Sequence, residues 1–244
     1  MLEIPRAVLS HHQHQRKGVT VFQVITTPDS LHMRQGAGTG FDSIGFIKQA
    51  TVLTALAVDS SGTWLQVKED GKGGKTGWCS ARYVVPASAV DSPWLAVAAK
   101  EVGTKEYPGN NYSHPRIQQY LATVNDLSAL EKLHDETAWC SCFMNWCVEQ
   151  TGRVGTDSAW AKSWGNWRKA AAISAMQTGD IAVFDRRSPK GGGGHVGIAI
   201  AIDTTAQKIL LLGGNQSDAV RYAWYPLDGM QRDTHYNLLS LRRA

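Results

Sequence analysis

The chain has 244 residues, of which 43% are hydrophobic and 19% are charged, and its formal net charge is +4. This composition excludes a disordered chain, and the length fits one large domain or two unequal ones. Lys and Arg form no block, so nucleic acid is not indicated as a partner, and no apolar run approaches the roughly 18 residues of a membrane-spanning helix. We therefore expect a soluble globular protein that does not insert into a membrane.

Residues 1–18 are predicted to be a flexible tail. They carry His11, His12 and His14 but no apolar segment of the kind that a secretory signal contains. The histidines indicate a solvated tail with incidental affinity for metals. Either the protein acts in the cytoplasm where it is made, or it leaves the cell by a route that reads no cleavable signal peptide.

Residues 19–86 are predicted to form an all-β unit. Runs rich in β-branched and apolar residues lie at 19–24, 51–58 and 64–67, and turn-forming residues separate them. This spacing of short strands and turns is typical of a small barrel. Residues 87–92 are small and polar and lie between two prolines, which is typical of a linker.

From residue 93 to residue 244 the pattern predicts helices first and strands afterwards. The first helix begins with Ser92 at its N-cap and Pro93 at its first position, an arrangement that favours helix initiation. Helices are predicted from apolar spacing at 93–102, 115–124, 139–150 and 158–171. Strands are predicted at 181–184, 196–202, 209–212 and 220–224. Helices followed by antiparallel strands indicate an α+β fold.

Three of the four cysteines lie within residues 140–147. Cys140 lies at the start of the third predicted helix, where free N–H groups and the helix dipole lower the pKa of a thiol. Cys142 and Cys147 lie on other helix faces, so they are expected to pack inside the protein. Zinc is disfavoured because Cys-x-Cys-x4-Cys matches none of the usual ligand spacings, and we expect no metal.

A nucleophilic thiol needs a base, and His195 is the best candidate because it opens the strand 196–202. A hairpin that turns near Thr205 would place Asn215 opposite His195, where its amide can accept the imidazole N–H and fix the tautomer. Cys140, His195 and Asn215 therefore form a candidate triad. The alternatives are a buried core cysteine and an asparagine that serves only a turn.

The tryptophans at 160, 164 and 167 have the spacing of a buried helical stripe. Core packing is the favoured interpretation of these three side chains. The alternative is a helix that flanks a cleft and lends one ring to a substrate.

The segment 135–147, DETAWCSCFMNWC, resembles the nucleophile helix of a CHAP-like branch of the NlpC/P60 cysteine peptidase superfamily. The resemblance continues in the expected order through residues 158–164, 179–184, 194–198 and 212–216. It implies a papain-like α+β domain over residues 93–244 that hydrolyses amide bonds in bacterial peptidoglycan.

The resemblance also assigns roles to individual residues. It makes Cys140 the nucleophile, His195 the general base and Asn215 the residue that orients the histidine, with Gln216 as the nearest alternative to Asn215. The family's glutamine ahead of the nucleophile is missing, so the backbone N–H of Cys140 is the expected oxyanion donor. No cofactor is implied. Candidates for substrate contacts are Asp135, Trp139, Trp164 and Gln216.

The first unit resembles a bacterial SH3 (SH3b) domain. Residues 31–36 (LHMRQG), 64–67 (WLQV) and 77–84 (GWCSARYV) match the strands L-N-V-R-x-G, W-x-x-V and G-W-V-x-x-x-Y-V. The resemblance implies an SH3-like barrel that docks on cell-wall peptides. Cys79 stands where the family usually has valine, so it is expected to be a small buried side chain.

Together these features predict a cysteine-dependent peptidoglycan hydrolase, either an endopeptidase or an N-acetylmuramoyl-L-alanine amidase. Without a signal peptide, the favoured role is an antibacterial effector delivered to the periplasm of rival bacteria. Its expected partners are peptidoglycan, a cognate immunity protein and a secretion-machine component. The alternatives are a phage-type lysin of the same chemistry, a non-catalytic wall-binding protein, and a cysteine transferase or protease that acts on proteins.

Overall fold

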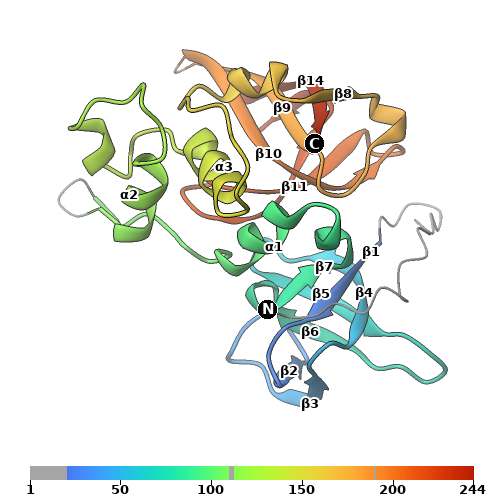
Figure 1. The fold of residues 1–244 in the computed structure, drawn as a ribbon. Coiled ribbons are helices and arrows are strands. Elements are labelled where there is room, and N and C mark those ends of the chain that lie inside the picture. Colours follow the sequence, from blue (N-terminus) through green and yellow to red (C-terminus); the bar gives the residue numbers. More distant parts are fainter. Residues whose placement is uncertain (1–20, 110–112, 190) are drawn as a thin grey trace.

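A computed structural model of the protein describes residues 21–109, 113–189 and 191–244. Within these residues the chain forms two seven-stranded antiparallel sheets, and the α-helices lie between them in the sequence (Figure 1). The predicted tail at 1–18, with its three histidines, lies outside the described residues. None of the described helices has the length and apolar character needed to cross a membrane.

The first sheet is built by the segment that the sequence predicts to be all-β. Its strands are Phe22–Thr26 (β1), Ser30–Arg34 (β2), Ser43–Lys48 (β3), Val52–Val58 (β4), Trp64–Glu69 (β5), Thr76–Ser80 (β6) and Val84–Pro86 (β7). Their order in the sheet is β3-β2-β6-β5-β4-β1-β7. Alternate side chains point into one core, and Cys79 is among them with no exposed surface. The predicted all-β unit and the buried Cys79 are both confirmed.

The predicted linker at 87–92 is not fully exposed. It contains a 3₁₀ turn at Ala87–Val90, in which Ala89 is buried. The apolar core continues from Val84 in the first unit to Trp94 and Leu95 in the second. The predicted position of the domain boundary stays a prediction.

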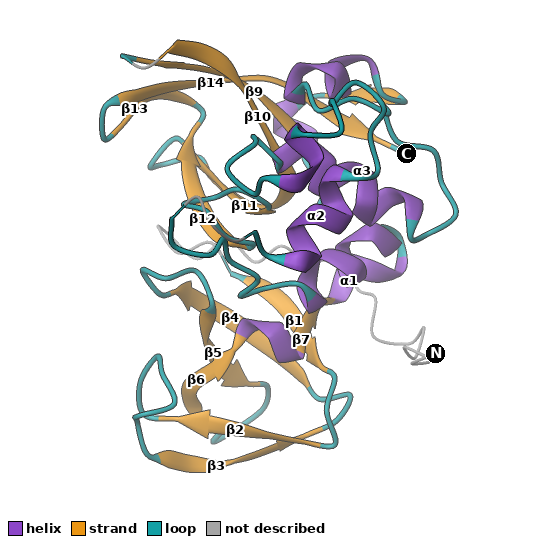
Figure 2. Cartoon of the chain, turned by 90° about the vertical axis from the view of Figure 1, so that its left-hand side faces the viewer, coloured by secondary structure: helices purple, strands orange, loops and turns teal. Residues whose placement is uncertain are grey.

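Three of the four predicted helices are present: Pro93–Lys100 (α1), Pro115–Leu121 (α2) and Cys140–Glu149 (α3). Proline occupies the first turn of α1 and of α2, where its missing N–H has no helical partner to lose. Figure 2 shows these helices on one side of the second sheet. They cover the sheet face formed by Ile181, Val183, Val196 and Ile198.

The fourth predicted helix is wrong. Ala161–Asn166 is a 3₁₀ helix, and Lys169–Ala171 is a strand (β8) that pairs with the last strand of the chain. A 3₁₀ helix has about three residues per turn, so side chains four and seven apart do not share a face. Accordingly Trp164 and Trp167 are buried, whereas Trp160 is 60% exposed.

The second sheet contains the four predicted strands and three more. Besides β8, its strands are Ile181–Ser188 (β9), Gly191–Asp203 (β10), Lys208–Gly213 (β11), Arg221–Pro226 (β12), Asp228–Gln231 (β13) and Thr234–Arg243 (β14). The order is β12-β11-β10-β9-β14-β13, with β8 beside β14. β8, β13 and β14 were not predicted, because β8 has only three residues and β13 and β14 carry many polar and charged residues. Helices packed on an antiparallel sheet confirm the α+β prediction.

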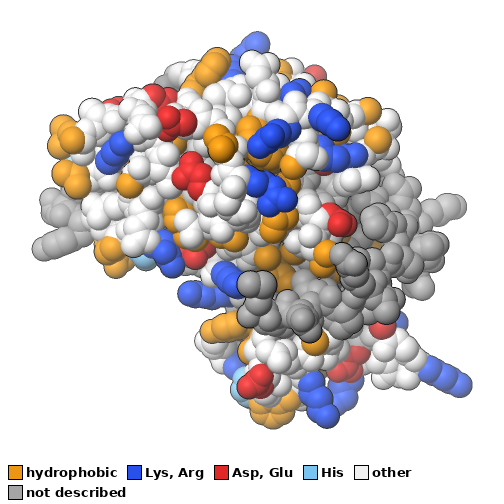
Figure 3. Space-filling model, in the orientation of Figure 1, with side chains coloured by type: hydrophobic (Ala, Val, Ile, Leu, Met, Phe, Trp, Pro, Cys, Tyr) orange, Lys and Arg blue, Asp and Glu red, His pale blue; other side chains and the backbone are white. Residues whose placement is uncertain are grey.

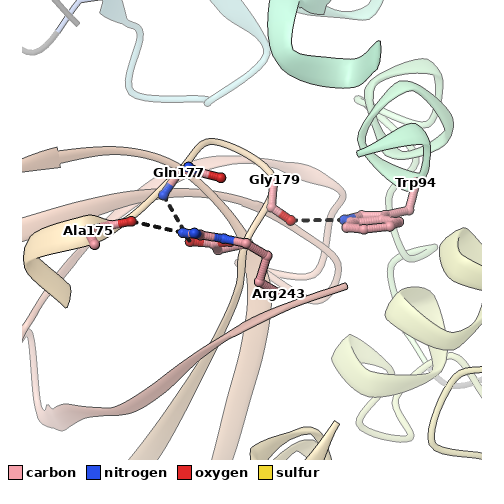
Figure 4. Close-up of polar contacts among 6 residues, drawn as sticks. Trp94, Ala175, Gln177, Gly179 and Arg243 are labelled. Carbon is pink, nitrogen blue, oxygen red and sulfur yellow. Dashed lines mark hydrogen bonds and ion pairs between the residues drawn. The ribbon is translucent and has the colours of Figure 1, made fainter. Parts of the chain in front are cut away.

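The indole of Trp94 fastens α1 to the second sheet, because its Nε1 donates to the carbonyl of Gly179 at 3.0 Å (Figure 4). Nearby, the guanidinium of Arg243 in β14 donates to the carbonyl of Ala175 and forms an ion pair with the buried carboxylate of Asp180 at 2.7 Å. These contacts fix the start of β9 to the end of β14. On the face in Figure 3, Lys and Arg side chains lie over both units, with acidic side chains among them.

Candidate active site

Cys140 is the first residue of α3, and Trp139 is the N-cap residue. The side chain is almost buried, with 7% of its surface exposed. Burial raises the pKa of the Cys140 thiol, although the backbone N–H groups of Val196 and Ser141 and the charge of Arg186 act in the opposite direction. The N–H groups at the start of α3 therefore do act to lower the pKa of the thiol, as predicted. Desolvation raises this pKa by more, so the predicted net lowering of the pKa is wrong.

His195 lies in β10, immediately before Val196, whose N–H interacts with the Cys140 sulfur. Its ring packs on the ring of Tyr225, with a centroid distance of 5.0 Å. Burial lowers the pKa of His195 from 6.5 to about 4, and the charge of Arg186 adds to this, while the hydrogen bond that His195 donates to Gln216 opposes it. The imidazole is therefore neutral near pH 7, as a general base must be.

Gln216 fixes the orientation of the imidazole. Its Oε1 lies 3.1 Å from Nε2 of His195, and its own amide nitrogen donates to the backbone carbonyl of Arg221. The carbonyl of Arg221 can accept only from the NH₂ group of Gln216, so Oε1 of Gln216 faces the histidine. Nε2 of His195 must therefore carry the proton. This tautomer leaves Nδ1 of His195 as the basic nitrogen, available to take a proton from a thiol.

Asn215 does not make this contact. None of the hydrogen bonds within the described residues involves its side chain, and its backbone has a left-handed φ of 53°. The predicted hairpin is present, with Ile198 opposite Leu212, but pairing stops there and a bulge interrupts the strand between Ala199 and Ala201. The chain then turns at residues 213–215, which directs Gln216 to the histidine. Gln216, which the sequence offered as the alternative to Asn215, therefore makes the contact that was predicted for Asn215.

Gly214 allows this turn to lie directly on α3. A Cβ atom at Gly214 would stand 2.5 Å from the ring of Trp139 and 2.7 Å from Cβ of Phe143. No side chain larger than hydrogen fits without displacing one of them. The close approach fixes the Gln216 segment against the helix that carries Cys140.

The geometry agrees with two matches to family models. Residues 133–215 match the CHAP domain, and this range includes Cys140 and His195 and ends one residue before Gln216. Residues 29–85 match the bacterial SH3 domain. The chain carries a CHAP domain behind a bacterial SH3 domain. The two resemblances read from the sequence are thus confirmed.

Similar solved structures cover 91% of this chain at low identity. They include NlpC2 and NlpC1 from Trichomonas vaginalis, at 15% and 13% identity, with TM-scores of 0.35 and 0.36 and 72% and 69% of those chains covered. An NlpC/P60 family protein from Bacillus cereus has 14% identity and a TM-score of 0.35, with 63% of its chain covered. No curated protein sequence matches this chain significantly.

Three of the predicted substrate-contacting residues of the CHAP domain are buried. Asp135 is 1% exposed, and its carboxylate accepts from the backbone N–H groups of Tyr107 and His114. Trp139 and Trp164 have no exposed surface. Their indole N–H groups donate to Glu106 and to Ser141. In this structure all three support the site rather than border it. The fourth candidate, Gln216, contacts the histidine.

Arg186 was not among the site residues predicted from the sequence. Arg186 in β9 pairs with Gly193 of β10 and with Tyr236 of β14, and Phe184 pairs with His195 two positions along the same strands, so the two pairs point to the same side. Directly paired residues share a sheet face, so Arg186 lies on the same face as the histidine. Gly193 has no side chain, and a guanidinium nitrogen of Arg186 lies 4.0 Å from the position that a Cβ atom of residue 193 would occupy. A positive charge therefore stands beside the site.

The pKa of His195 predicts an acid-sensitive fold. Unfolded histidine takes up a proton near pH 6.5, whereas folded His195 stays neutral down to about pH 4. Between these values the unfolded state binds more protons, so stability falls as the pH falls, by up to about 3 kcal/mol. We expect urea unfolding at pH 7.0 and 4.5 to show a smaller loss for His195→Gln than for the unsubstituted protein. Equal losses in both proteins would contradict the assignment.

Proposed function

We propose that the protein is a cysteine hydrolase that cleaves an amide bond in the peptide stem of peptidoglycan. The observation that carries the proposal is the contact of Gln216 with Nε2 of His195, which leaves Nδ1 as the basic nitrogen of a residue whose neighbour Val196 donates its N–H to the Cys140 sulfur. The CHAP match supports a cysteine peptidase of the peptidoglycan-hydrolase type. The SH3 match supports a docking function on the wall.

The resting pair is a neutral thiol and a neutral imidazole, because burial disfavours both charged forms. As the Cys140 sulfur attacks the carbonyl carbon, Nδ1 of His195 takes the thiol proton and a tetrahedral oxyanion forms. The backbone N–H of Cys140 donates to that oxyanion. His195 then gives the proton to the leaving amine, and the C–N bond breaks to leave a thioester. Water, deprotonated by His195, hydrolyses the thioester and restores the thiol.

Mass spectrometry of digested wall tests the proposal and identifies the bond. Purified sacculi are incubated with the protein, and the muropeptides released by a muramidase are compared with those from untreated sacculi. An amidase yields peptides with a free L-Ala amine, whereas an endopeptidase yields a new amine within the stem or at a cross-link. Intact muropeptides after exhaustive incubation of a folded protein would leave only wall binding and would contradict hydrolysis.

Arg186 is expected to recognise a carboxylate of the stem. Its neighbours Lys162 and Arg187 both pair with the carboxylate of Asp185, but Arg186 forms no ion pair among the described residues. It contacts Tyr236 and is exposed. The stem peptide carries free carboxylates, which suit an unpaired guanidinium.

We expect Arg186→Gln to raise KM for soluble muropeptides about tenfold while kcat changes less, because one charge-assisted hydrogen bond to substrate is lost. Steady-state kinetics at several substrate concentrations measure this split. Arg187→Gln is the matched control, because the guanidinium of Arg187 is already paired with Asp185. An equal rise in KM for both variants would indicate general electrostatic attraction instead of recognition by Arg186.

We propose further that the hydrolase acts as an antibacterial effector in the periplasm of rival cells. A phage-type lysin is the alternative role with the same chemistry. Expression of the chain with and without a periplasmic signal in a Gram-negative host tests the site of action, since the substrate lies only outside the inner membrane. Lysis confined to the periplasmic form, and suppressed by a product of a neighbouring gene, supports an effector with an immunity protein. Lysis that no neighbouring product suppresses supports the lysin.

A further inference from the structure

The turn between β4 and β5 of the SH3 domain is hydrogen-bonded to the start of β12 in the second sheet. The carbonyl of Gly62 accepts from the backbone N–H of Tyr222 at 2.9 Å. The carbonyl of Ser60 accepts from the guanidinium of Arg221 at 2.7 Å. Arg221 and Tyr222 are the first two residues of β12. The turn therefore contacts both the side chain and the backbone at the start of this strand.

The turn is held in one shape by the carboxylate of Asp59. This carboxylate accepts from the backbone N–H groups of Ser61 at 2.9 Å, Thr63 at 3.1 Å and Trp64 at 2.9 Å. Hydrogen bonds from a side chain to several backbone groups of one turn fix its conformation. The carbonyls of residues 60 and 62 are thus presented to β12 by a rigid loop.

Gly62 is required at its position for two reasons. Its φ of +70° lies in the left-handed region, and the residue is buried at the contact. A Cβ atom at Gly62 would stand 2.0 Å from the carbonyl oxygen of Tyr222 and 2.7 Å from Nε of Arg221. Any other residue would push the start of β12 away from the turn.

The start of β12 in turn holds Gln216. The backbone carbonyl of Arg221 accepts from the side-chain amide of Gln216, and the other end of that amide contacts Nε2 of His195 at 3.1 Å. Four groups in a row therefore connect the SH3 domain with the imidazole: the turn at residues 60–62, Arg221, Gln216 and His195. Each link is a direct hydrogen bond or covalent connection.

From this continuous path we infer that the Ser60–Gly62 turn of the SH3 domain is a positioning element for His195. The turn fixes Arg221, the carbonyl of Arg221 fixes the amide of Gln216, and the amide selects the tautomer and angle of the imidazole. The inference rests on the proposed function in treating His195 as the base. It adds to wall docking a second role for the SH3 domain, which acts on the chemical step even when the substrate is too small to reach the SH3 surface.

The test uses full-length protein with Gly62→Ala, and Gly71→Ala as the matched control. Gly71 also has a left-handed φ, of +104°, but no atom lies within 4 Å of its Cβ position. Arg221→Met is a second variant, which removes the donor to Ser60 and keeps an unbranched side chain. Two readouts are taken: turnover of a soluble muropeptide, and ¹H–¹⁵N spectra of the histidine rings, with His195 assigned by His195→Gln.

We expect Gly62→Ala and Arg221→Met to lower kcat about tenfold or more with KM nearly unchanged, since small misplacements of catalytic groups have effects of this size. The ¹⁵N shifts of His195 should change from a single Nε2–H tautomer to a mixture, and Gly71→Ala should change neither readout. If folded Gly62→Ala or Arg221→Met keeps the original kcat and tautomer, the inference is wrong. If the unsubstituted protein turns over no muropeptide, the proposed function fails, and the tautomer spectra still decide whether the turn positions His195.

Discussion

Replacing Cys140 with alanine is expected to reduce the release of muropeptides from sacculi by roughly 10³-fold or more, to the rate without protein. Alanine removes the sulfur that forms the thioester and leaves the start of α3 unchanged in shape. Release of soluble fragments from labelled sacculi, together with a circular dichroism melt, separates the loss of chemistry from a loss of folding. Hydrolysis that survives in folded Cys140→Ala would exclude the proposed mechanism.

The other cysteines supply the controls for this experiment. Cys79, Cys142 and Cys147 have no exposed surface, and burial raises the pKa of each thiol, to about 12 for Cys79 and Cys142. Cys142→Ala therefore tests an inert thiol two residues from the proposed nucleophile, and we expect it to retain hydrolysis. Iodoacetamide should label Cys140 first and abolish activity in parallel, because only Cys140 among the four has exposed surface.

The sequence predicted the elements that carry the site because their signals are local. Proline at the first helical turn and apolar residues at helical spacing give α1 and α2, and α3 lies within the predicted helix 139–150. The strands at 196–202 and 209–212 are continuous apolar runs, so their pairing as a hairpin also follows. Cys140 begins α3, close to the predicted start of that helix. His195 was predicted to open its strand, but β10 begins at Gly191, because the glycines before the histidine also pair with β9.

The remaining features depend on contacts that local spacing does not encode. The turn after Leu212 decides which side chain reaches the histidine, and within it Gly214 packs directly on Trp139 and Phe143. The region 158–171 has helical apolar spacing, but Ala161–Asn166 winds as a 3₁₀ helix and only Lys169–Ala171 pairs with β14. Arg186 carries no motif and is identified only by its sheet partners.

Replacing Gln216 and Asn215 one at a time tests which of the two residues orients His195. Gln216→Ala removes both the acceptor for Nε2 of His195 and the donor to the carbonyl of Arg221. The imidazole then loses its fixed tautomer, and we expect kcat to fall on the order of 10²-fold, a typical part of general-base catalysis. Gln216→Glu can still accept from Nε2 but cannot donate to Arg221, so its kcat should lie between those of the alanine variant and the unsubstituted protein.

Asn215→Ala is the matched comparison, with the same truncation one residue away. Its side chain makes no hydrogen bond within the described residues, but its left-handed φ of 53° suits asparagine better than alanine. Alanine there should cost some stability, whereas Asn215→Gly relieves that strain and should keep kcat within about twofold. A loss of activity in Asn215→Gly as large as that in Gln216→Ala would return the orienting role to Asn215. Kinetics on soluble muropeptides, with thermal unfolding of each variant, distinguish these outcomes because an orienting residue changes kcat, while a turn residue changes chiefly the melting temperature.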